Sequence, residues 1–313
     1  MIITVTLNPA VDKTVELLDF KVGALNRIQS VRKDAGGKGI NVSKVVAELD
    51  GNTKALGFLG GSSGQFIKDR LTSAGITHSF TQVEGETRTN LKIIDLATTK
   101  ETEVNEPGPN ISKEALINLE ENLLNNVTKD NLVVLAGSLP IGVPEDFYAQ
   151  LITKLQDKGV KVVLDTSGIP LMKALEVKPY LIKPNLDELE KLINKPLKDT
   201  DEVINAAKML HQRGIGIIVV SLGSEGSIVV SGSGVLKIKP PKIEVGSSVG
   251  AGDTLVGALS LKLSQGESLK DAIGYATAAS ANTVVQSGTQ ICKKDEVEEL
   301  LTQVEIKILE QRS

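Results

Sequence analysis

Short aliphatic runs alternate along the chain with longer amphipathic stretches. Most of the short runs are rich in Val, Ile and Leu, which is typical of strands covered on both faces of a parallel sheet. Each run is therefore expected to form a buried strand. The runs occupy residues 2–7 (IITVTL), 53–59 (TKALGFL), 132–137 (LVVLAG), 160–165 (VKVVLD), 180–185 (YLIKPN) and 215–223 (IGIIVVSLG).

The stretches between these runs have the spacing of amphipathic helices. Residues 41–51, 65–75 and 145–159 each end at a glycine, a common C-terminal stop for a helix. The first of these helices is expected to begin at about Ile40. Alternating strands and helices predict an α/β fold, with a central, mostly parallel sheet and helices on both of its faces.

Two segments break this pattern. Residues from about 14 to 33 and from about 87 to 105 alternate polar and apolar positions with a period of two, as in strands with one face in water. Such strands do not fit a sheet that is buried on both faces. We expect them to form a small β-sheet lid over one edge of the main sheet, within a single domain spanning residues 1–313.

Composition narrows the class of protein. The 313 residues carry a formal net charge of −4, which argues against a general nucleic-acid-binding protein. The single cysteine, Cys292, excludes an internal disulfide, and His78 and His211 lack the spacing of metal ligands. No stretch has the character of a membrane span or a signal peptide. We expect a soluble cytoplasmic protein.

The carboxyl ends of the strands are where open parallel sheets bind ligands. One segment that is expected there holds Gly250, Ala251, Gly252 and Asp253 ahead of an apolar helix. Asp is a favoured N-cap, so one interpretation is that Asp253 caps this helix. The other is that the bare N–H groups bind an anion and that Asp253 acts on a hydroxyl beside it.

A second segment is unusually rich in glycine. Gly36, Gly37 and Gly39 surround Lys38 ahead of a helix. A tight turn needs one or two glycines, whereas close approach of the backbone to a ligand explains three. Lys38 and Asn41 would then face a polyhydroxyl or phosphate-bearing substrate.

Two later segments also allow a structural and a functional interpretation. Asn185 and Glu188 have the spacing of a capping box at the start of a helix, and equally of a pair that contacts phosphate or metal-bound water. Residues 221–226 (SLGSEG) form either a simple turn after a strand or a loop that supports a nucleotide.

Common nucleotide and hydrolase motifs are absent or incomplete. No GxxxxGK[ST] loop occurs, and the first strand is not followed by GxGxxG. Residues 60–64 (GGSSG) match the GxSxG of serine hydrolases, but His211 falls in a polar, helical stretch and does not suit the catalytic histidine.

Four pieces, in this order, resemble the signatures of the ribokinase-like sugar kinases, also called the phosphofructokinase B family. They are GGKGINVS (residues 36–43), Asn185 with Glu188, SLG (221–223) and VGAGDTLVGAL (249–259). The similarity covers roughly residues 2–290. It implies an α/β domain beneath a small β lid, and transfer of the γ-phosphoryl group of ATP to a sugar hydroxyl with the help of Mg²⁺.

The resemblance also implies roles for individual residues. Asp253 would be the catalytic base, and the amides of Gly250, Ala251 and Gly252 would form the anion hole. Glu188 would act on Mg²⁺ through water. The nucleotide-binding residues implied are Asn185, Ser221, Gly223, Gly226 and Asn282.

On the substrate side, LNPAVD (7–12), GETRTN (85–90) and NEPGP (105–109) resemble the branch of the family that acts on phosphorylated ketohexoses. Arg88 is the best candidate for the substrate phosphate, because its fork can bind two phosphate oxygens. Whether Arg27 contacts substrate stays open. The substrate-binding residues implied are Asp12, Gly37, Lys38, Asn41, Arg88 and Ser138.

The expected reaction is phosphorylation of fructose 1-phosphate to fructose 1,6-bisphosphate by ATP. Tagatose 6-phosphate and fructose 6-phosphate are the alternative substrates. We expect small molecules as the only ligands, without nucleic acid or membrane. The family's lids often pair across a dimer, and the apolar lid positions Val15, Leu17, Leu91 and Ile93 permit this.

Overall fold

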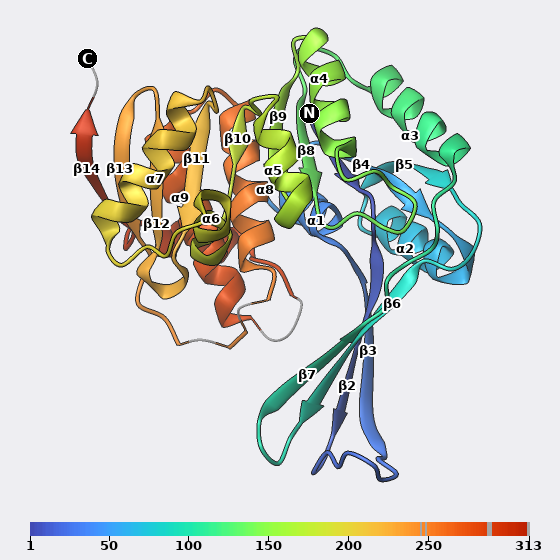
Figure 1. Cartoon of the computed structure of the whole chain (residues 1–313). Coiled ribbons are helices and arrows are strands. Elements are labelled where there is room, and N and C mark those ends of the chain that lie inside the picture. Colours follow the sequence, from blue (N-terminus) through green and yellow to red (C-terminus); the bar gives the residue numbers. More distant parts are fainter. Residues whose placement is uncertain (245, 248, 287–289, 312–313) are drawn as a thin grey trace.

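In the described part of the chain, ten strands form a large sheet that runs through the body of the molecule (Figure 1). The computed structural model describes residues 1–244, 246–247, 249–286 and 290–311. From β11 to β5 all neighbouring strands are parallel, whereas β12, β13 and β14 run antiparallel. In spatial order the strands are β14 (Glu305–Gln311), β13 (Gly234–Lys239), β12 (Ser227–Ser231), β11 (Ile217–Ser221), β10 (Leu181–Ile182), β9 (Lys161–Asp165), β8 (Leu132–Ala136), β1 (Ile2–Thr6), β4 (Thr53–Leu59) and β5 (Thr77–Gln82).

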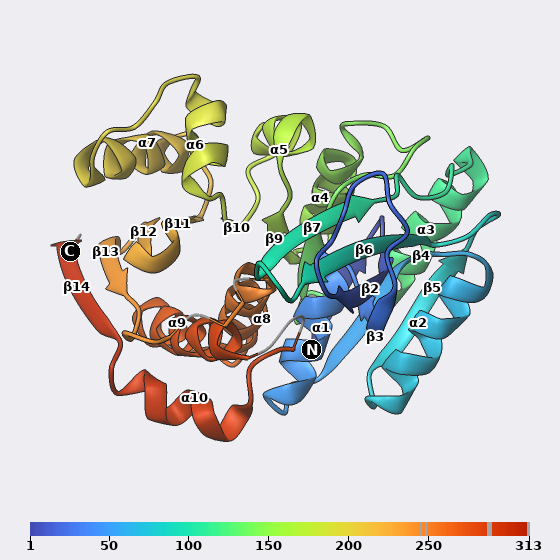
Figure 2. The same cartoon turned by 90° about the horizontal axis from the view of Figure 1, so that it is seen from below.

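Helices cover both faces of this sheet (Figure 2). One layer contains α1 (Lys38–Glu48), α2 (Gly61–Ser73), α8 (Ala251–Ser264), α9 (Leu269–Val285) and α10 (Lys294–Leu301). The other contains α3 (Lys113–Asn126), α4 (Phe147–Asp157), α5 (Gly168–Leu175), α6 (Leu186–Ile193) and α7 (Thr200–Gln212). A 3₁₀ turn, Gly223–Glu225, follows β11. The mostly parallel α/β architecture expected from the sequence is confirmed.

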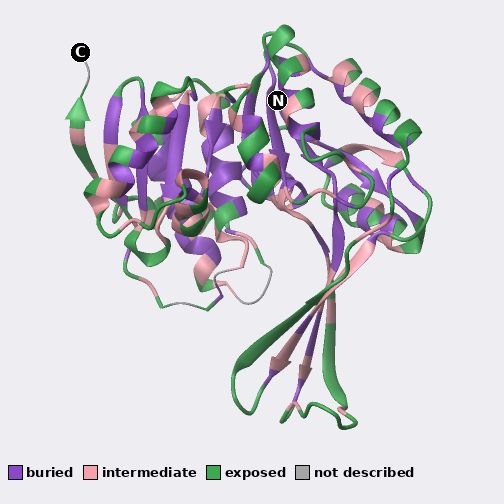
Figure 3. Cartoon of the chain, in the orientation of Figure 1, coloured by how far each residue is buried: buried purple, intermediate pink, exposed green. Residues whose placement is uncertain are grey.

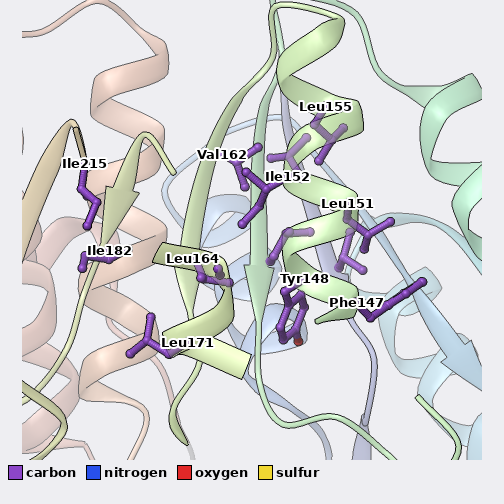
Figure 4. Close-up of a cluster of buried hydrophobic side chains, with 14 of the residues drawn as sticks. Phe147, Tyr148, Leu151, Ile152, Leu155, Val162, Leu164, Leu171, Ile182 and Ile215 are labelled. Carbon is purple, nitrogen blue, oxygen red and sulfur yellow. The ribbon is translucent and has the colours of Figure 1, made fainter. Parts of the chain in front are cut away.

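The core lies in two parts, one on each side of the sheet. Side chains alternate along β1, so Ile3 and Val5 pack with α3 and α4, whereas Ile2 packs with α1 and α8. This two-sided cover explains why β1 is buried along its whole length and rich in aliphatic residues. Figure 4 shows part of the first cluster, where Tyr148 also donates its hydroxyl to the carbonyl of Gly137 at 3.0 Å.

A second, four-stranded sheet projects away from the body (Figure 1). Its strands, in spatial order, are β3 (Ile28–Gly36), β2 (Ala10–Leu17), β6 (Arg88–Asp95) and β7 (Lys100–Asn105). We call it the small sheet. It contains strands from both segments with alternating polarity, and β2 and β3 also run back into the body, to Ala10 and Gly36. Figure 3 shows that much of its surface is exposed, unlike the strands of the large sheet.

The two faces of the small sheet differ in character. Directly paired residues share a face, and Asp12 pairs with both Asp34 and Asn90. On the opposite face, Val15 pairs with Val31 and Ile93. The polar face therefore carries the candidate sugar-binding residues, and the apolar face points away from them.

Two of the expected boundaries that differ from the structure have a clear physical cause. α1 begins at Lys38, because Gly37 takes the N-cap position with a φ of 112° that favours glycine. The strand expected over residues 180–185 is only Leu181–Ile182, because Pro184 follows and Asn185 already caps α6. Across the described parts of the chain, no helix is both long and apolar enough to cross a membrane.

Candidate active site

The N-termini of α1 and α8 meet beside the carboxyl ends of the parallel strands. Asn41 of α1 donates its Nδ2 hydrogen to Oδ2 of Asp253 on α8 at 2.8 Å. Lys38, one turn earlier on α1, donates to Oδ1 of Asp165 at the end of β9, at 2.9 Å. Residues far apart in the sequence thus form one connected cluster.

Asp253 does not cap its helix. The N-cap of α8 is Gly250, which has a left-handed φ of 81°, and Asp253 is the third residue of the helix. Its side chain accepts from Asn41 instead of a helix amide. The capping interpretation of Asp253 is wrong, because a glycine supplies the turn and leaves the carboxylate free to point into the site.

Burial changes the acidity of Asp253. The residue is 8 % exposed, and burial raises its pKa to about 6. The nearby carboxylate of Asp165 acts in the same direction, whereas Asn41, Lys38 and Lys183 oppose the rise. A carboxylate with a pKa just below neutrality is well suited to accept a proton at physiological pH.

Two lysines flank the start of α8. Lys183 lies 3.6 Å from Oδ1 of Asp165, the carboxylate that also binds Lys38. A Cβ atom on Gly252 would lie 3.4 Å from the ammonium of Lys183. The helix N-terminus, with its unpaired amides, and the two ammonium groups therefore surround one space that suits a phosphoryl group.

The candidate sugar site lies at the base of the small sheet. Asn90 donates to Oδ1 of Asp12 at 3.0 Å. A Cβ atom on Gly36 would lie 1.9 Å from the other oxygen of Asp12, so this carboxylate rests directly on the Gly36 backbone. Gly37 has a positive φ, and a Cβ there would lie 2.8 Å from Thr6. Both glycines thus serve close packing.

Arg88 begins β6 and is partly engaged within the chain. Its terminal nitrogens donate to the carbonyls of Asn8 at 3.0 Å and Glu106 at 3.2 Å. Two of the guanidinium nitrogens that were expected to bind phosphate oxygens are therefore already bonded to main-chain carbonyls. Ser138 lies nearby and accepts from Asn8 Nδ2 at 3.4 Å.

Buried polar atoms without a hydrogen-bond partner gather around this site. Such atoms are rare in folded proteins and call for an explanation. Within the described ranges they include Oγ1 of Thr6, Oδ1 of Asn8, Nε of Arg88, Oδ1 of Asn90 and Oδ2 of Asp165. Two of them are packed against the main chain, since a Cβ on Gly39 would lie 2.4 Å from Thr6 Oγ1 and a Cβ on Gly108 would lie 2.3 Å from Asn8 Oδ1.

A cavity of about 690 Å³ opens on the other side of the α8 N-terminus. It contains Ser221, Gly223 and Gly226, three of the residues expected to bind the nucleotide. Its walls include the segment 239–243 and the helix α9, through Thr277, Ser280, Ala281 and Val284. Lys183 and Gly252 also line it, so the cavity reaches the phosphoryl space described above.

Asn282 does not line this cavity. Its Nδ2 donates to Glu296 at 2.9 Å, and its Oδ1 accepts from the amide of Lys293 at 2.8 Å. The side chain thus points toward α10, and neighbouring positions of α9 face the cavity instead. The helical period turns Asn282 to the other side, so a nucleotide contact by its side chain is not supported by this geometry.

Asn185 and Glu188 form a capping box. Asn185 Oδ1 accepts from the amide of Glu188 at 2.8 Å, and Glu188 Oε2 accepts from the amide of Asn185 at 2.9 Å. The structural interpretation of this pair is confirmed. Asn185 also forms a bridge with Ser221, which holds the start of α6 beside the nucleotide cavity.

Three residues of the site escaped the sequence reasoning. Asp165 and Lys183 lie in segments that follow strands, DTSG and KPNLDE, but no local motif distinguished them. Asn90 lies two residues after Arg88 and shares its face of the small sheet. That spacing and its place in GETRTN (85–90) were the available signals, but Asn90 itself was not singled out.

The serine-hydrolase alternative has no support here. Ser62 binds the carboxylate of Glu86. His78 bonds to Thr72, and His211 bonds to the carbonyl of Ile215. In the described part of the chain neither histidine contacts Ser62.

Comparison with known proteins agrees with this geometry. The model of the pfkB family carbohydrate kinases matches residues 5–296. The chain belongs to this family. It is 38 % identical over 307 residues to a 1-phosphofructokinase of Borreliella burgdorferi, covering 98 % of each chain, and 42 % identical over 265 residues to a 1-phosphofructokinase of Xanthomonas campestris pv. campestris, covering 83 % of each.

A solved structure supports the same assignment. The phosphofructokinase-2 of Escherichia coli, in complex with potassium, matches with a TM-score of 0.93 and 30 % identity, over 96 % of this chain and 98 % of that one. This carbohydrate kinase therefore has the ribokinase-like fold, with a large, mostly parallel sheet and a smaller separate sheet.

Proposed function

We propose that this kinase transfers the γ-phosphoryl group of ATP to the free primary hydroxyl of fructose 1-phosphate. The observation that carries the proposal is the Asn41–Asp253 pair beside the α8 N-terminus, which places a proton acceptor next to an anion site. The names of the curated relatives support the choice of sugar phosphate. Tagatose 6-phosphate and fructose 6-phosphate are the alternatives.

Asp253 accepts the proton of the attacking hydroxyl. Asn41 holds one carboxylate oxygen, so the other is left to face the sugar. The amides at Gly250, Ala251 and Gly252 stabilise the charge on the transferred group. Their advantage is that they are fixed before the reaction, as part of the helix start.

The two lysines position and neutralise the phosphates. Asp165 holds both Lys38 and Lys183, so their charges stay in place when no ligand is bound. Lys183 faces the nucleotide cavity and Lys38 extends from the sugar-side helix. The phosphoryl group would pass between them.

The site also fits Mg²⁺ held mainly by phosphates and water. Among the described residues, no group of three metal-ligating side chains occurs. The buried Oδ2 of Asp165 lacks a partner, and Glu188 and Asp165 both act electrostatically on Lys38, so two carboxylates lie near the phosphoryl space. When bound, the ion neutralises phosphate charge. Glu188 and Asp165 would orient its water ligands.

The sugar is bound by the base of the small sheet. Asp12, Asn41 and Gly37 face its hydroxyls, and Arg88 and Ser138 face its phosphate end. Lys38 contacts the sugar at the end that receives the phosphoryl group. The small sheet then acts as a lid over the site, within the single domain 1–313. The nucleotide rests on Ser221, Gly223 and Gly226, with Asn185 supporting them.

A coupled assay of ADP release tests this function. It compares fructose 1-phosphate, fructose 6-phosphate, tagatose 6-phosphate, fructose and ribose at matched concentrations. We expect the highest kcat/KM for fructose 1-phosphate. A preference for unphosphorylated fructose or ribose would overturn the assignment.

We also propose that the apolar face of the small sheet pairs with a second copy. Val15 and Leu17 are buried within the chain, but Val31 and Val104 on the same face are 52 % and 55 % exposed. A structure of the E. coli phosphofructokinase-2 is described as tetrameric, which shows assembly in a relative. Sedimentation of the wild type and of Val31→Glu tests the proposal; a monomeric wild type contradicts it.

A further inference from the structure

Helix α1 presents three polar side chains to other parts of the site. Lys38, Asn41 and Lys44 follow one another at intervals of three residues, so they lie on adjoining parts of the helix surface. The first two bind the carboxylates of the phosphoryl-transfer site. Lys44 donates instead to the main-chain carbonyl of Ala35, and the mechanism above does not use it.

The carbonyl of Ala35 belongs to the peptide that joins Ala35 to Gly36. This peptide supports Asp12, whose carboxylate rests on the Gly36 backbone. Asn90 holds the carboxylate from the other side. Displacing the peptide therefore displaces the proposed sugar-binding oxygen atoms of Asp12.

Lys44 is also a cation among carboxylates. Burial lowers its pKa, and Asp34, Asp12 and Asp253 oppose this change. In turn, burial raises the pKa of Asp12; Asp34 adds to the rise, whereas the hydrogen bond from Asn90 and the charges of Lys44 and Arg88 oppose it. The other charged groups beside Lys44 line the groove behind it: Arg32, Lys33, Glu48 and Arg70.

We propose that Lys44 is a positioning residue for the sugar, which holds the Ala35–Gly36 peptide beneath Asp12 and supplies positive charge beside that carboxylate. This inference rests on the proposed role of Asp12 in sugar binding. Lys44 connects α1 to the end of the small sheet that joins the body. In the same way, Asn41 connects α1 to Asp253, the proposed proton acceptor. A purely structural anchor of the turn would instead affect stability without favouring either substrate.

Two substitutions separate geometry from charge. Lys44→Gln removes the charge, and Lys44→Arg keeps it. We expect Lys44→Gln to raise the KM for fructose 1-phosphate about tenfold while the KM for ATP stays within about twofold, and Lys44→Arg to restore most of the loss. The matched control is Lys158→Gln. Lys158, at the C-terminal end of α4, also donates to a main-chain carbonyl, that of Leu124 at 2.8 Å.

The pH dependence of sugar binding distinguishes the two roles of Lys44, because loss of a purely structural anchor would not shift it. The dissociation constant for fructose 1-phosphate is measured against pH in an Asp253→Asn background, where the base does not titrate. Without the cation, Asp12 takes up a proton more readily, so Lys44→Gln shifts the loss of binding at acid pH to a higher pH. The control Lys158→Gln leaves it in place.

Each outcome decides one question. Unchanged KM and pH dependence in Lys44→Gln overturn the inference, as does an equal loss for sugar and ATP together with a lower melting temperature. A wild type that is inactive on fructose 1-phosphate instead contradicts the proposed function. If Lys44→Gln does not fold, Lys44→Cys is compared before and after alkylation with 2-bromoethylamine, which restores an ammonium; Cys292 is the other cysteine and is buried.

Discussion

Asn41 Nδ2 lies 2.8 Å from Oδ2 of Asp253, across 212 positions of sequence. The contact joins the start of the sugar-side helix α1 to the third residue of α8. It orients the carboxylate away from its own helix. The proposed chemistry depends on this orientation.

Asp253→Asn is expected to reduce kcat by at least about 10²-fold, the lower range for loss of a general base. Dissociation constants for ATP and sugar phosphate should stay within a few-fold, since the amide has nearly the same shape. Asp271→Asn is the matched control, because Asp271 is also the third residue of its helix. Near-normal turnover of the Asp253 variant would remove the base from the mechanism.

The raised pKa of Asp253 has consequences for both activity and stability. We expect the acid limb of kcat near pH 6. A carboxyl whose pKa is raised on folding stabilises the folded state below its unfolded pKa, and that contribution is lost as the pH rises through about 6. At pH 8 the free energy of unfolding of Asp253→Asn should therefore exceed that of the wild type by up to about 3 kcal/mol.

Denaturant melts at several pH values measure this effect. The gain in unfolding free energy of Asp253→Asn should shrink toward pH 4. There the wild-type carboxyl is protonated, so both side chains are uncharged. A gain that does not vary with pH would point to packing instead of charge.

Gly252→Val should reduce turnover at least about tenfold with little effect on melting temperature. Gly252 is exposed, so the branched side chain does not disturb the core. It would instead enter the space beside Lys183, because a Cβ atom added to Gly252 would lie 3.4 Å from the ammonium of Lys183. Gly252→Ala should have a smaller effect in the same direction. A collapse of melting temperature in parallel with activity would assign the glycine to folding.

Arg88→Ala should raise the KM for fructose 1-phosphate by about tenfold or more. Charge-assisted hydrogen bonds contribute about 1.5–3 kcal/mol each, and the buried Nε of Arg88 lacks a partner. The KM for ATP should change little, because Arg88 is not among the residues that line the nucleotide cavity. Any weak activity on fructose should also be unaffected.

The contacts of Arg88 with the main chain make a control necessary. Arg88 holds the carbonyls of Asn8 and Glu106, so its loss can also loosen the base of the small sheet. Comparing both sugars on both proteins isolates the phosphate contribution. Equal losses for fructose and fructose 1-phosphate would assign Arg88 to support of the sheet.

Sequence patterns predicted the parts of the fold in which burial dominates. β1, β4, β8, β9, β10 and β11 lie between two helical layers, so their aliphatic character identified them. β5 (THSFTQ), an edge strand of the same sheet, lacks this character and was not predicted. β14, at the edge of the sheet, is exposed except for the half-buried Ile306 and Leu309, and its sequence lacks that signal. The length of β10 was also overestimated, because only the structure shows where the capping of α6 begins.

The candidate site was predicted where chemistry lies within one motif, as at Gly250 to Asp253. It was missed where topology alone brings residues together. Asp165 and Lys183 meet because β9 and β10 are adjacent and parallel, which no local pattern reveals. The orientation of Asn282 depends on how α9 and α10 pack, and this decides which side of α9 faces the cavity.

The charged borders of the small sheet limit how it can associate. β7, at one edge, is exposed along its whole length and carries Lys100, Glu101 and Glu103. β3, at the other, carries Arg32 and Lys33. Charged side chains on edge strands hinder the addition of further strands, which is how proteins resist growth into aggregates. Such a sheet can stack by its apolar face while its open edges remain protected from endless strand pairing.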